Sequence, residues 1–391
     1  MDGRLCAVAL RGNAATVRNV ASPRPRLASL DVFRGAAIGS MIVVNTAASR
    51  EAAYPALLHA RWNGWTFADT IFPAFLWIVG VSLTLSTAAR IERGAHRASL
   101  VWHALRRSIL LFACGVALDW ITFPTRSFPF VGVDVPAHVQ LTGVLQKISV
   151  AYFIAFVIFV LATWRGVVAA IVALNAVYLA TLFFYPVPGC GAGVVTPDCN
   201  FPGYLDRTLL AGHLWHNPPL QDPDALGSLL PAAATVLLGV LAGYVLRAKS
   251  PAFGVIRRFG AMGLALALSG VALSFWVPIN KPIWTTSYAL LMCGISTLCF
   301  AACYWLVDVR GWRRWFTPLE ILGMNALAAY MLSRLLMNLP KIHIAGKSFY
   351  EDVCLKIGDP LNASLLYALS YTAGVLVIVW LMYRQRVFLK L

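Results

Sequence analysis

Apolar stretches of about 20 residues recur along the entire chain, and no other feature of the sequence constrains the fold as strongly. A helix of that length rises about 30 Å, which is the thickness of the hydrocarbon core of a bilayer. Hydrophobic residues make up 59% of the 391 residues and charged residues only 12%, whereas a typical soluble domain is about a quarter charged. We therefore expect an all-α polytopic membrane protein with about ten transmembrane helices. The candidate spans are 28–48, 67–89, 102–122, 143–163, 166–185, 228–247, 257–277, 284–307, 316–336 and 365–385.

Lysine and arginine are distributed unevenly between alternate connections of these spans. The formal net charge is +16, but the basic residues punctuate the apolar runs instead of clustering on one water-exposed domain, so we expect no nucleic-acid partner. Of the 32 Lys and Arg residues, 21 fall in connections on the side of the N-terminus and 8 in those on the opposite side. Because basic residues favour the cytoplasmic side, we expect both termini in the cytoplasm, with a cytoplasmic segment at 1–27 and the membrane domain at 28–391.

Two connections on the expected non-cytoplasmic side are long, at 186–227 and 337–364. Loops of this length are usually functional. Cys190 and Cys199 lie close together in the first loop, on the oxidising side, where they can form a disulfide or remain two thiols. The sequence contains no metal-ligand spacing such as CxxC and no P-loop, GxSxG, HExxH or GxGxxG motif, so we expect no metal.

Polar side chains interrupt the first span. Asp31 and Arg34 are three residues apart, so they lie on one helical face, where they can neutralise each other. Asn45 follows Arg34 after nearly three whole turns and returns to almost the same face. Such intramembrane groups are candidates for function, although the Asp31–Arg34 pair can also be purely structural.

A polar and aromatic segment follows the first span. It contains His59, Trp62, Asn63 and Asp69. Aromatic rings can cover the apolar faces of a sugar while amide and carboxylate groups bond its hydroxyls. The same residues can instead form an interfacial aromatic belt, and Asp69 can simply cap the second helix. The residues alone therefore indicate a polar site at the outer membrane face with a candidate general base.

Basic side chains lie near both membrane surfaces. Arg107, at the cytoplasmic start of the third span, can pair with phosphates or with lipid headgroups. Gln146 and Lys147 begin the fourth span, where Lys147 can snorkel or bind an acidic or hydroxylated ligand. Lys281 and Trp284 repeat the combination of a cation and an aromatic ring at the outer edge.

Two further positions have several interpretations. Asn325 interrupts the ninth span and can satisfy a broken backbone, bond a partner helix or touch a ligand. Asp206 and Arg207, in the first long loop, can close that loop over the site or merely pair with each other.

Several blocks of sequence carry a family resemblance. The strings RLASLDVFRGAAIGSMIVVN, HARWNGWTFADTIFPAFLWIVGVSLTLS and GVLQKISVAYF are followed in order by CNFPGYLDRTLLAG, DPDALGSLLPAAATVLLGVLAG, INKPIWTTSYALL and LGMNALAAYMLSR. With these blocks, which cover nearly everything from residue 27 onward, the chain resembles the heparan-α-glucosaminide N-acetyltransferase family of transmembrane acyltransferases. It shows no counterpart of the long lumenal N-terminal domain of the lysosomal enzyme, so it looks like a bacterial member. Lys147 stands where an arginine is common, which keeps the charge but not the planar guanidinium.

The resemblance implies transfer of acetyl from acetyl-CoA to the amino group of a terminal glucosamine or related amino sugar. It implies His59 as the catalytic histidine with Asn45 beside it, a homodimer, and, for a bacterial member, the inner membrane. An imidazole can take a proton from the sugar ammonium, and Asn45 can donate to the developing oxyanion. We expect direct attack in a ternary complex, with a covalent acetyl-His59 intermediate as the alternative.

Topology constrains this chemistry, because acetyl-CoA is made in the cytosol and His59 is expected at the opposite face. We therefore expect a conduit between helices, with the CoA phosphates near cytoplasmic basic residues. The acetyl-CoA candidates are Arg34, Arg107, Gln146, Lys147 and Asn325, and the sugar candidates are Trp62, Asn63, Asp69, Asp206, Lys281 and Trp284.

Two other functions fit the sequence. One is O-acylation of a cell-envelope polysaccharide, in which a hydroxyl replaces the amine as nucleophile. The other is transport of a sugar, in which the intramembrane polar groups line a translocation path.

Overall fold

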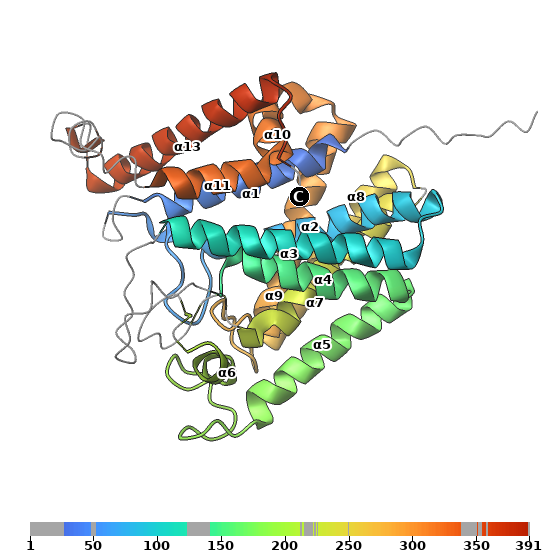
Figure 1. Cartoon of the computed structure of the whole chain (residues 1–391), viewed down its shortest axis with the longest axis vertical. Coiled ribbons are helices and arrows are strands. Elements are labelled where there is room, and N and C mark those ends of the chain that lie inside the picture. The colour runs from blue at the N-terminus through green and yellow to red at the C-terminus, as the bar shows by residue number, and fades with distance from the viewer. Residues whose placement is uncertain are drawn as a thin grey trace, which may run out of the picture.

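The structure is a computed structural model, and it describes residues 27–47, 52–122, 141–211, 213–214, 222, 224, 226–248, 250–337, 350, 354–356 and 359–389. Within these ranges the chain forms a bundle of helices (Figure 1). The only β-type pairing among the described residues consists of two isolated bridges, Asn63 with Asn280 and Val187 with Gly191.

Nine helices in the described part of the chain are long and apolar enough to cross a membrane. They are α1 (Ala28–Asn45), α2 (Phe67–Glu92), α3 (Arg97–Thr122), α4 (Val144–Leu161), α5 (Trp164–Phe184), α7 (Leu229–Arg247), α8 (Ala252–Leu273), α9 (Thr286–Tyr304) and α13 (Pro360–Arg384). Three shorter helices are α6 (Phe201–Leu209), α10 (Thr317–Met324) and α11 (Ala326–Leu335). The prediction of an all-α polytopic membrane protein is confirmed.

The expected span at 316–336 consists of two short helices. The segment is divided into α10 and α11 at Asn325, whose backbone has φ −121° and ψ 37°. The Asn325 side chain explains the break, because its amide donates to the Val387 carbonyl (3.0 Å) and its oxygen accepts from the Leu389 N–H (3.2 Å). Of the three interpretations of Asn325, the structure therefore supports a side chain that satisfies irregular backbone.

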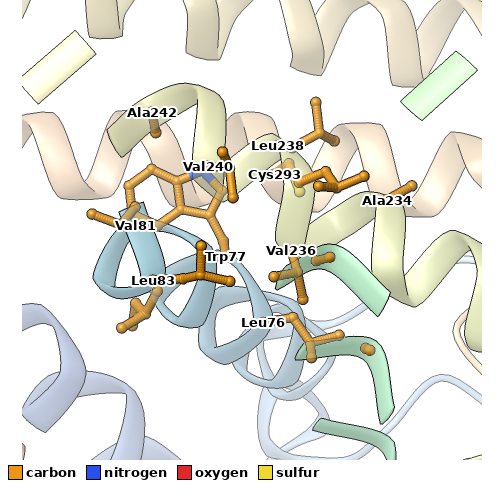
Figure 2. Close-up of a cluster of buried hydrophobic side chains, with 14 of the residues drawn as sticks. Leu76, Trp77, Val81, Leu83, Ala234, Val236, Leu238, Val240, Ala242 and Cys293 are labelled. Carbon is orange, nitrogen blue, oxygen red and sulfur yellow. The ribbon is translucent and has the colours of Figure 1, made fainter. Parts of the chain in front are cut away.

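Small residues allow the central helices to approach closely. Helices α2 and α7 pack along much of their length, and a Cβ at Gly239 would overlap the Trp77 carbonyl oxygen. Figure 2 shows the Trp77 ring beside Val240 of α7, within a core to which Cys293 of α9 also contributes. Close backbone approach at small residues is a common means of association for membrane helices.

The peripheral helices have a different surface. Most side chains of α5, α8 and α13 are not buried within the chain, and their exposed residues include Val172, Leu268 and Val377. Apolar side chains on outer helix faces suit contact with lipid tails.

The ends of α1, α2 and α3 define the two ends of the bundle. We call the end where α2 begins the outer end, and the end where α2 finishes and α3 begins the inner end. The connection after α5 contains α6 and a disulfide between Cys190 and Cys199, so the disulfide alternative is the one that the structure contains. The N–H group of the Trp62 ring donates to the Val195 carbonyl (3.0 Å), which ties this connection to the segment that precedes α2.

Candidate active site

Two loops meet at the outer end and place His59 and Lys281 side by side. The loop before α2 pairs with the loop before α9 through the Asn63–Asn280 bridge. The Gly64 N–H donates to the Ile279 carbonyl (2.8 Å), and the Asn280 amide donates to the Asn63 side-chain oxygen (3.1 Å). This pairing explains how residues more than 200 positions apart come to share one site.

Asp69 lies at the centre of the site. It is the third residue of α2, and its Oδ2 accepts hydrogen bonds from the N–H groups of Thr66 and Ala60, both at 3.0 Å. The bond from Thr66 satisfies the amide of the residue that caps the helix, as the capping interpretation predicted, and the bond from Ala60 holds the preceding loop. The Tyr288 hydroxyl donates to the Asp69 carbonyl oxygen at 2.6 Å. The carboxylate is thus held from several sides, and its side chain is only 1% exposed.

The remaining oxygen of Asp69 faces two nitrogen-bearing side chains. Oδ1 lies 2.8 Å from His59 Nδ1 and 3.2 Å from Lys281 Nζ. Lys281 Nζ is also 2.9 Å from His59 Nδ1. Burial lowers the pKa of Lys281, and the charge of Asp69 opposes that shift.

The contact with Asp69 favours one tautomer of His59. A proton on Nδ1 is stabilised by donation to Asp69, which leaves Nε2 with its lone pair. The His59 side chain is 43% exposed, so a solute can reach this imidazole. Nε2 lies 3.4 Å from Lys281 Nζ. The arrangement of a buried carboxylate and an oriented, partly exposed imidazole is suited to a general base.

A second layer of side chains lies one helical turn below. Trp284 is completely buried, and its ring N–H donates to the Thr235 hydroxyl at 3.2 Å. Lys147 of α4 is also buried, with its ammonium 4.1 Å from the centre of the Trp284 ring. Trp284 therefore has no exposed face, and we assign it to the support of the site instead of direct sugar contact.

A cavity of about 410 Å³, which we call the inner cavity, lies between the helices and is lined on α2 by residues from Phe75 to Leu83. Both Arg34 and Arg107 line it, so the structure brings these two acetyl-CoA candidates together. Arg34 pairs with Asp31 at 2.9 Å, as the sequence predicted, and donates to the Ser82 hydroxyl at 2.8 Å. The Arg107 guanidinium stacks over the Tyr152 ring, 5.3 Å from its centre. The rest of the lining is mostly apolar and comes from α1, α2, α3, α4, α10, α11 and Leu389.

Two other acetyl-CoA candidates have protein partners and do not line this cavity. The Gln146 amide donates to Asp119 at 3.0 Å, and Arg334 contacts the other oxygen of Asp119 at 3.2 Å. Asn325 holds the C-terminal backbone, as described above. However, Leu389, which Asn325 holds in place, is part of the cavity lining.

Asn45 ends α1 and is exposed. Within the described ranges, no hydrogen bond joins its side chain to His59. Its proximity to His59 therefore stays a prediction.

The remaining sugar candidates hold the loops together. Trp62 and Asn63 use their polar groups in the loop contacts given above. Asp206 is buried, and its Oδ1 accepts from the Leu226 N–H at 2.7 Å, which closes the connection after α5. Burial raises the pKa of Asp206 to about 7.

Sequence reasoning missed several residues of the site. Ser82, Tyr152 and Tyr288 lie within apolar runs, and hydroxyl groups there are too common to be informative. Asp224, whose carboxylate is 4.0 Å from Lys147, lies in a loop where acidic residues are ordinary.

Comparisons with known proteins identify the family of the chain. A family model described as "Heparan-alpha-glucosaminide N-acetyltransferase, catalytic" matches residues 26–280, a range that includes His59 and Asp69. The Homo sapiens protein named heparan-alpha-glucosaminide N-acetyltransferase is 29% identical over 96% of this chain and 61% of its own length. The Mus musculus protein of the same name is 28% identical over 94% of this chain and 60% of its own length. The chain thus spans about three fifths of these relatives. Because the family match covers well over half of its residues, the chain belongs to the heparan-alpha-glucosaminide N-acetyltransferase catalytic family.

Proposed function

We propose that this protein transfers acetyl from acetyl-CoA to the amino group of a terminal glucosamine, or a related amino sugar, at the non-cytoplasmic face of the membrane. The observation that carries the proposal is the contact of 2.8 Å between His59 Nδ1 and the buried carboxylate of Asp69, with the imidazole open to solvent. The names of the relatives support the reaction class.

His59 acts on the acceptor. Its Nε2 takes a proton from the sugar ammonium, and the resulting amine attacks the thioester carbonyl carbon. An imidazole titrates near neutral pH, so it can accept this proton and release it again. Asp69 stabilises the imidazolium that forms, and the exposed Asn45 remains our candidate donor to the oxyanion. We prefer direct attack in a ternary complex to an acetyl-His59 intermediate, because direct attack needs a single acyl-transfer step.

The inner cavity suits the donor. Arg34 and Arg107 can pair with phosphate groups, and the apolar lining can accept an uncharged chain. Acetyl-CoA would supply the activated acetyl group. The lining includes no residue of the loop that carries His59, so the acetyl group must pass the layer of Lys147 and Trp284 to reach the base.

The location of the reaction follows from the positive-inside argument and from the disulfide. A disulfide is expected on an oxidising side of a membrane, and Trp62 ties the Cys190–Cys199 segment to the loop that carries His59. We also propose that the protein lies in a bacterial inner membrane and forms a homodimer.

The test is transfer of labelled acetyl from acetyl-CoA to amino sugars by the purified protein. We expect transfer to glucosamine and none to N-acetylglucosamine, which lacks a free amine. We also expect His59→Ala to lose about 10²–10⁴-fold of turnover, the usual contribution of a general base. His96→Ala, at an exposed histidine before α3, is the matched control.

Other outcomes would identify a different function. Equal transfer to N-acetylglucosamine would indicate O-acylation. A transporter would be indicated if the wild type transferred no acetyl and the His59→Ala variant still moved sugar across the membrane.

A further inference from the structure

An ammonium group without a hydrogen bond is buried below the candidate active site. The Lys147 side chain is 1% exposed, and its Nζ has no hydrogen-bond partner among the described residues. The carboxylate of Asp224 is 4.0 Å away, beyond hydrogen-bond distance. An ammonium carries three donors, and leaving them unmet in a buried place is costly. This arrangement indicates a position for an acceptor atom that the described residues do not supply.

Two aromatic rings hold the ammonium in place. Nζ lies 4.1 Å from the centre of the Trp284 ring and 5.7 Å from that of Phe72, both within the range of a cation–π interaction. Trp284 has a backbone φ of 53°, which is rare for a bulky residue. Such a conformation persists only where surrounding contacts enforce it, and here Thr235 holds the ring. The protein thus uses a strained residue to fix the position of Lys147.

Helical register places Lys147 between the cavity and His59. On α2, Asp69 contacts His59, Phe72 contacts Lys147 one turn later, and Phe75 lines the cavity after a further turn. On α4, the neighbours of Lys147 at positions 145 and 148 also line the cavity. An acyl group that moves from the cavity to His59 therefore passes the ammonium of Lys147.

We propose that Lys147 Nζ donates a hydrogen bond to the carbonyl oxygen of the acetyl group and stabilises the negative charge that develops there. The inference rests on the proposed function. The sugar amine forms the new C–N bond, and the carbonyl π electrons move to the oxygen beside Lys147. When the carbonyl reforms, the C–S bond breaks and CoA leaves as a thiolate. His59 already holds the proton taken from the sugar ammonium, so the second proton, on the nitrogen of the tetrahedral intermediate, passes to the departing thiolate, and the Lys147 ammonium keeps its own protons throughout.

The first test is a comparison of two ligands in binding to the detergent-purified protein. Acetyl-CoA has the carbonyl oxygen, whereas S-ethyl-CoA has the same chain without it. We expect the wild type to bind acetyl-CoA about tenfold more tightly, because a hydrogen bond to a charged donor is worth at least that factor. We expect Lys147→Met to bind both ligands equally and Lys147→Arg to keep the preference. Lys356→Met, at an exposed lysine, is the matched control.

The outcomes separate this role from the proposed function. Equal binding of the two ligands by the wild type would overturn the role of Lys147, whether or not any variant folds. A preference that survives in Lys147→Met would also overturn it. In the transfer assay we expect Lys147→Met to lose about 10²-fold or more of kcat, as for removal of an oxyanion donor. Full turnover by Lys147→Met would refute this inference alone, whereas a wild type that transfers no acetyl would refute the proposed function and this role together.

Discussion

Replacement of Asp69 by asparagine tests the orientation of His59 with almost no change of shape. In the wild type, Oδ2 accepts from the N–H groups of Ala60 and Thr66, both at 3.0 Å. An asparagine must present its oxygen either to these two donors or to the side of His59 and Lys281, whose Nζ is 3.2 Å from Oδ1 in the wild type. Presenting its NH₂ group to the two amides would leave both of them unsatisfied, at about 1–3 kcal/mol each. The oxygen therefore faces the backbone, and the NH₂ group faces His59.

This orientation reverses the hydrogen bond to the imidazole. The asparagine NH₂ group donates to Nδ1, so the proton of neutral His59 moves to Nε2 and the lone pair is lost from the side where the acceptor binds. Loss of general-base catalysis is worth about 10²–10⁴ in rate, or about 3–5 kcal/mol in the activation barrier. We expect Asp69→Asn to lower kcat by this factor while acetyl-CoA affinity stays unchanged, since Asp69 does not line the cavity.

The assay is labelled acetyl transfer to glucosamine, together with acetyl-CoA binding and a thermal melt of each purified variant. Asp198→Asn, at an exposed aspartate in the connection after α5, serves as the control for loss of one negative charge. Wild-type kcat in a folded Asp69→Asn protein would refute the argument that Asp69 orients the base.

Three further predictions follow from other parts of the structure. Burial raises the pKa of Asp206 from 3.8 to about 7, so the folded protein binds more protons than the unfolded chain between these pH values and loses stability as the pH rises through them. Asp206→Asn should therefore melt with the wild type near pH 4 and at a higher temperature above pH 7. Arg34→Ala and Arg107→Ala should each weaken acetyl-CoA binding by about tenfold or more, the value of a charge-assisted hydrogen bond to phosphate, and unchanged affinity in isothermal titration would count against the inner cavity as the donor site. Gly239→Val should destabilise the protein by at least about 1–3 kcal/mol, because its Cβ meets the Trp77 carbonyl; an unchanged midpoint in chemical denaturation would contradict this.

The positions of the membrane helices were predictable because a single physical requirement, backbone hydrogen bonding within lipid, determines them. Backbone groups in lipid must bond within their own helix, so apolar runs long enough to span the bilayer become helices, as α2, α4 and α7 do. The same rule failed at Asn325, because hydropathy does not report whether an amide side chain has backbone to bind. That backbone belongs to Val387 and Leu389, which are 62 and 64 residues away.

The candidate site was predictable only in part. His59, in the loop before α2, and Asp69, in the first turn of α2, are only ten residues apart, so the local sequence indicated both. Lys281 is 222 residues from His59, and its contact depends on the pairing of two loops through Asn63 and Asn280. The sequence analysis interpreted Asn63 as a sugar ligand and did not single out Asn280, since no local pattern reveals that two side chains will bond each other across such a separation.

Helix α2 relates the two halves of the proposed reaction. It carries Asp69 in its first turn and Ser82, which bonds Arg34, thirteen residues later, a rise of about 20 Å. A phosphate held by Arg34 is therefore separated from the base by most of the thickness of the hydrocarbon core. Donor and acceptor then enter from opposite ends, and neither must leave before the other binds. This separation favours a ternary complex, because both substrates can be held at once and only the acetyl group has to cross the layer of Lys147.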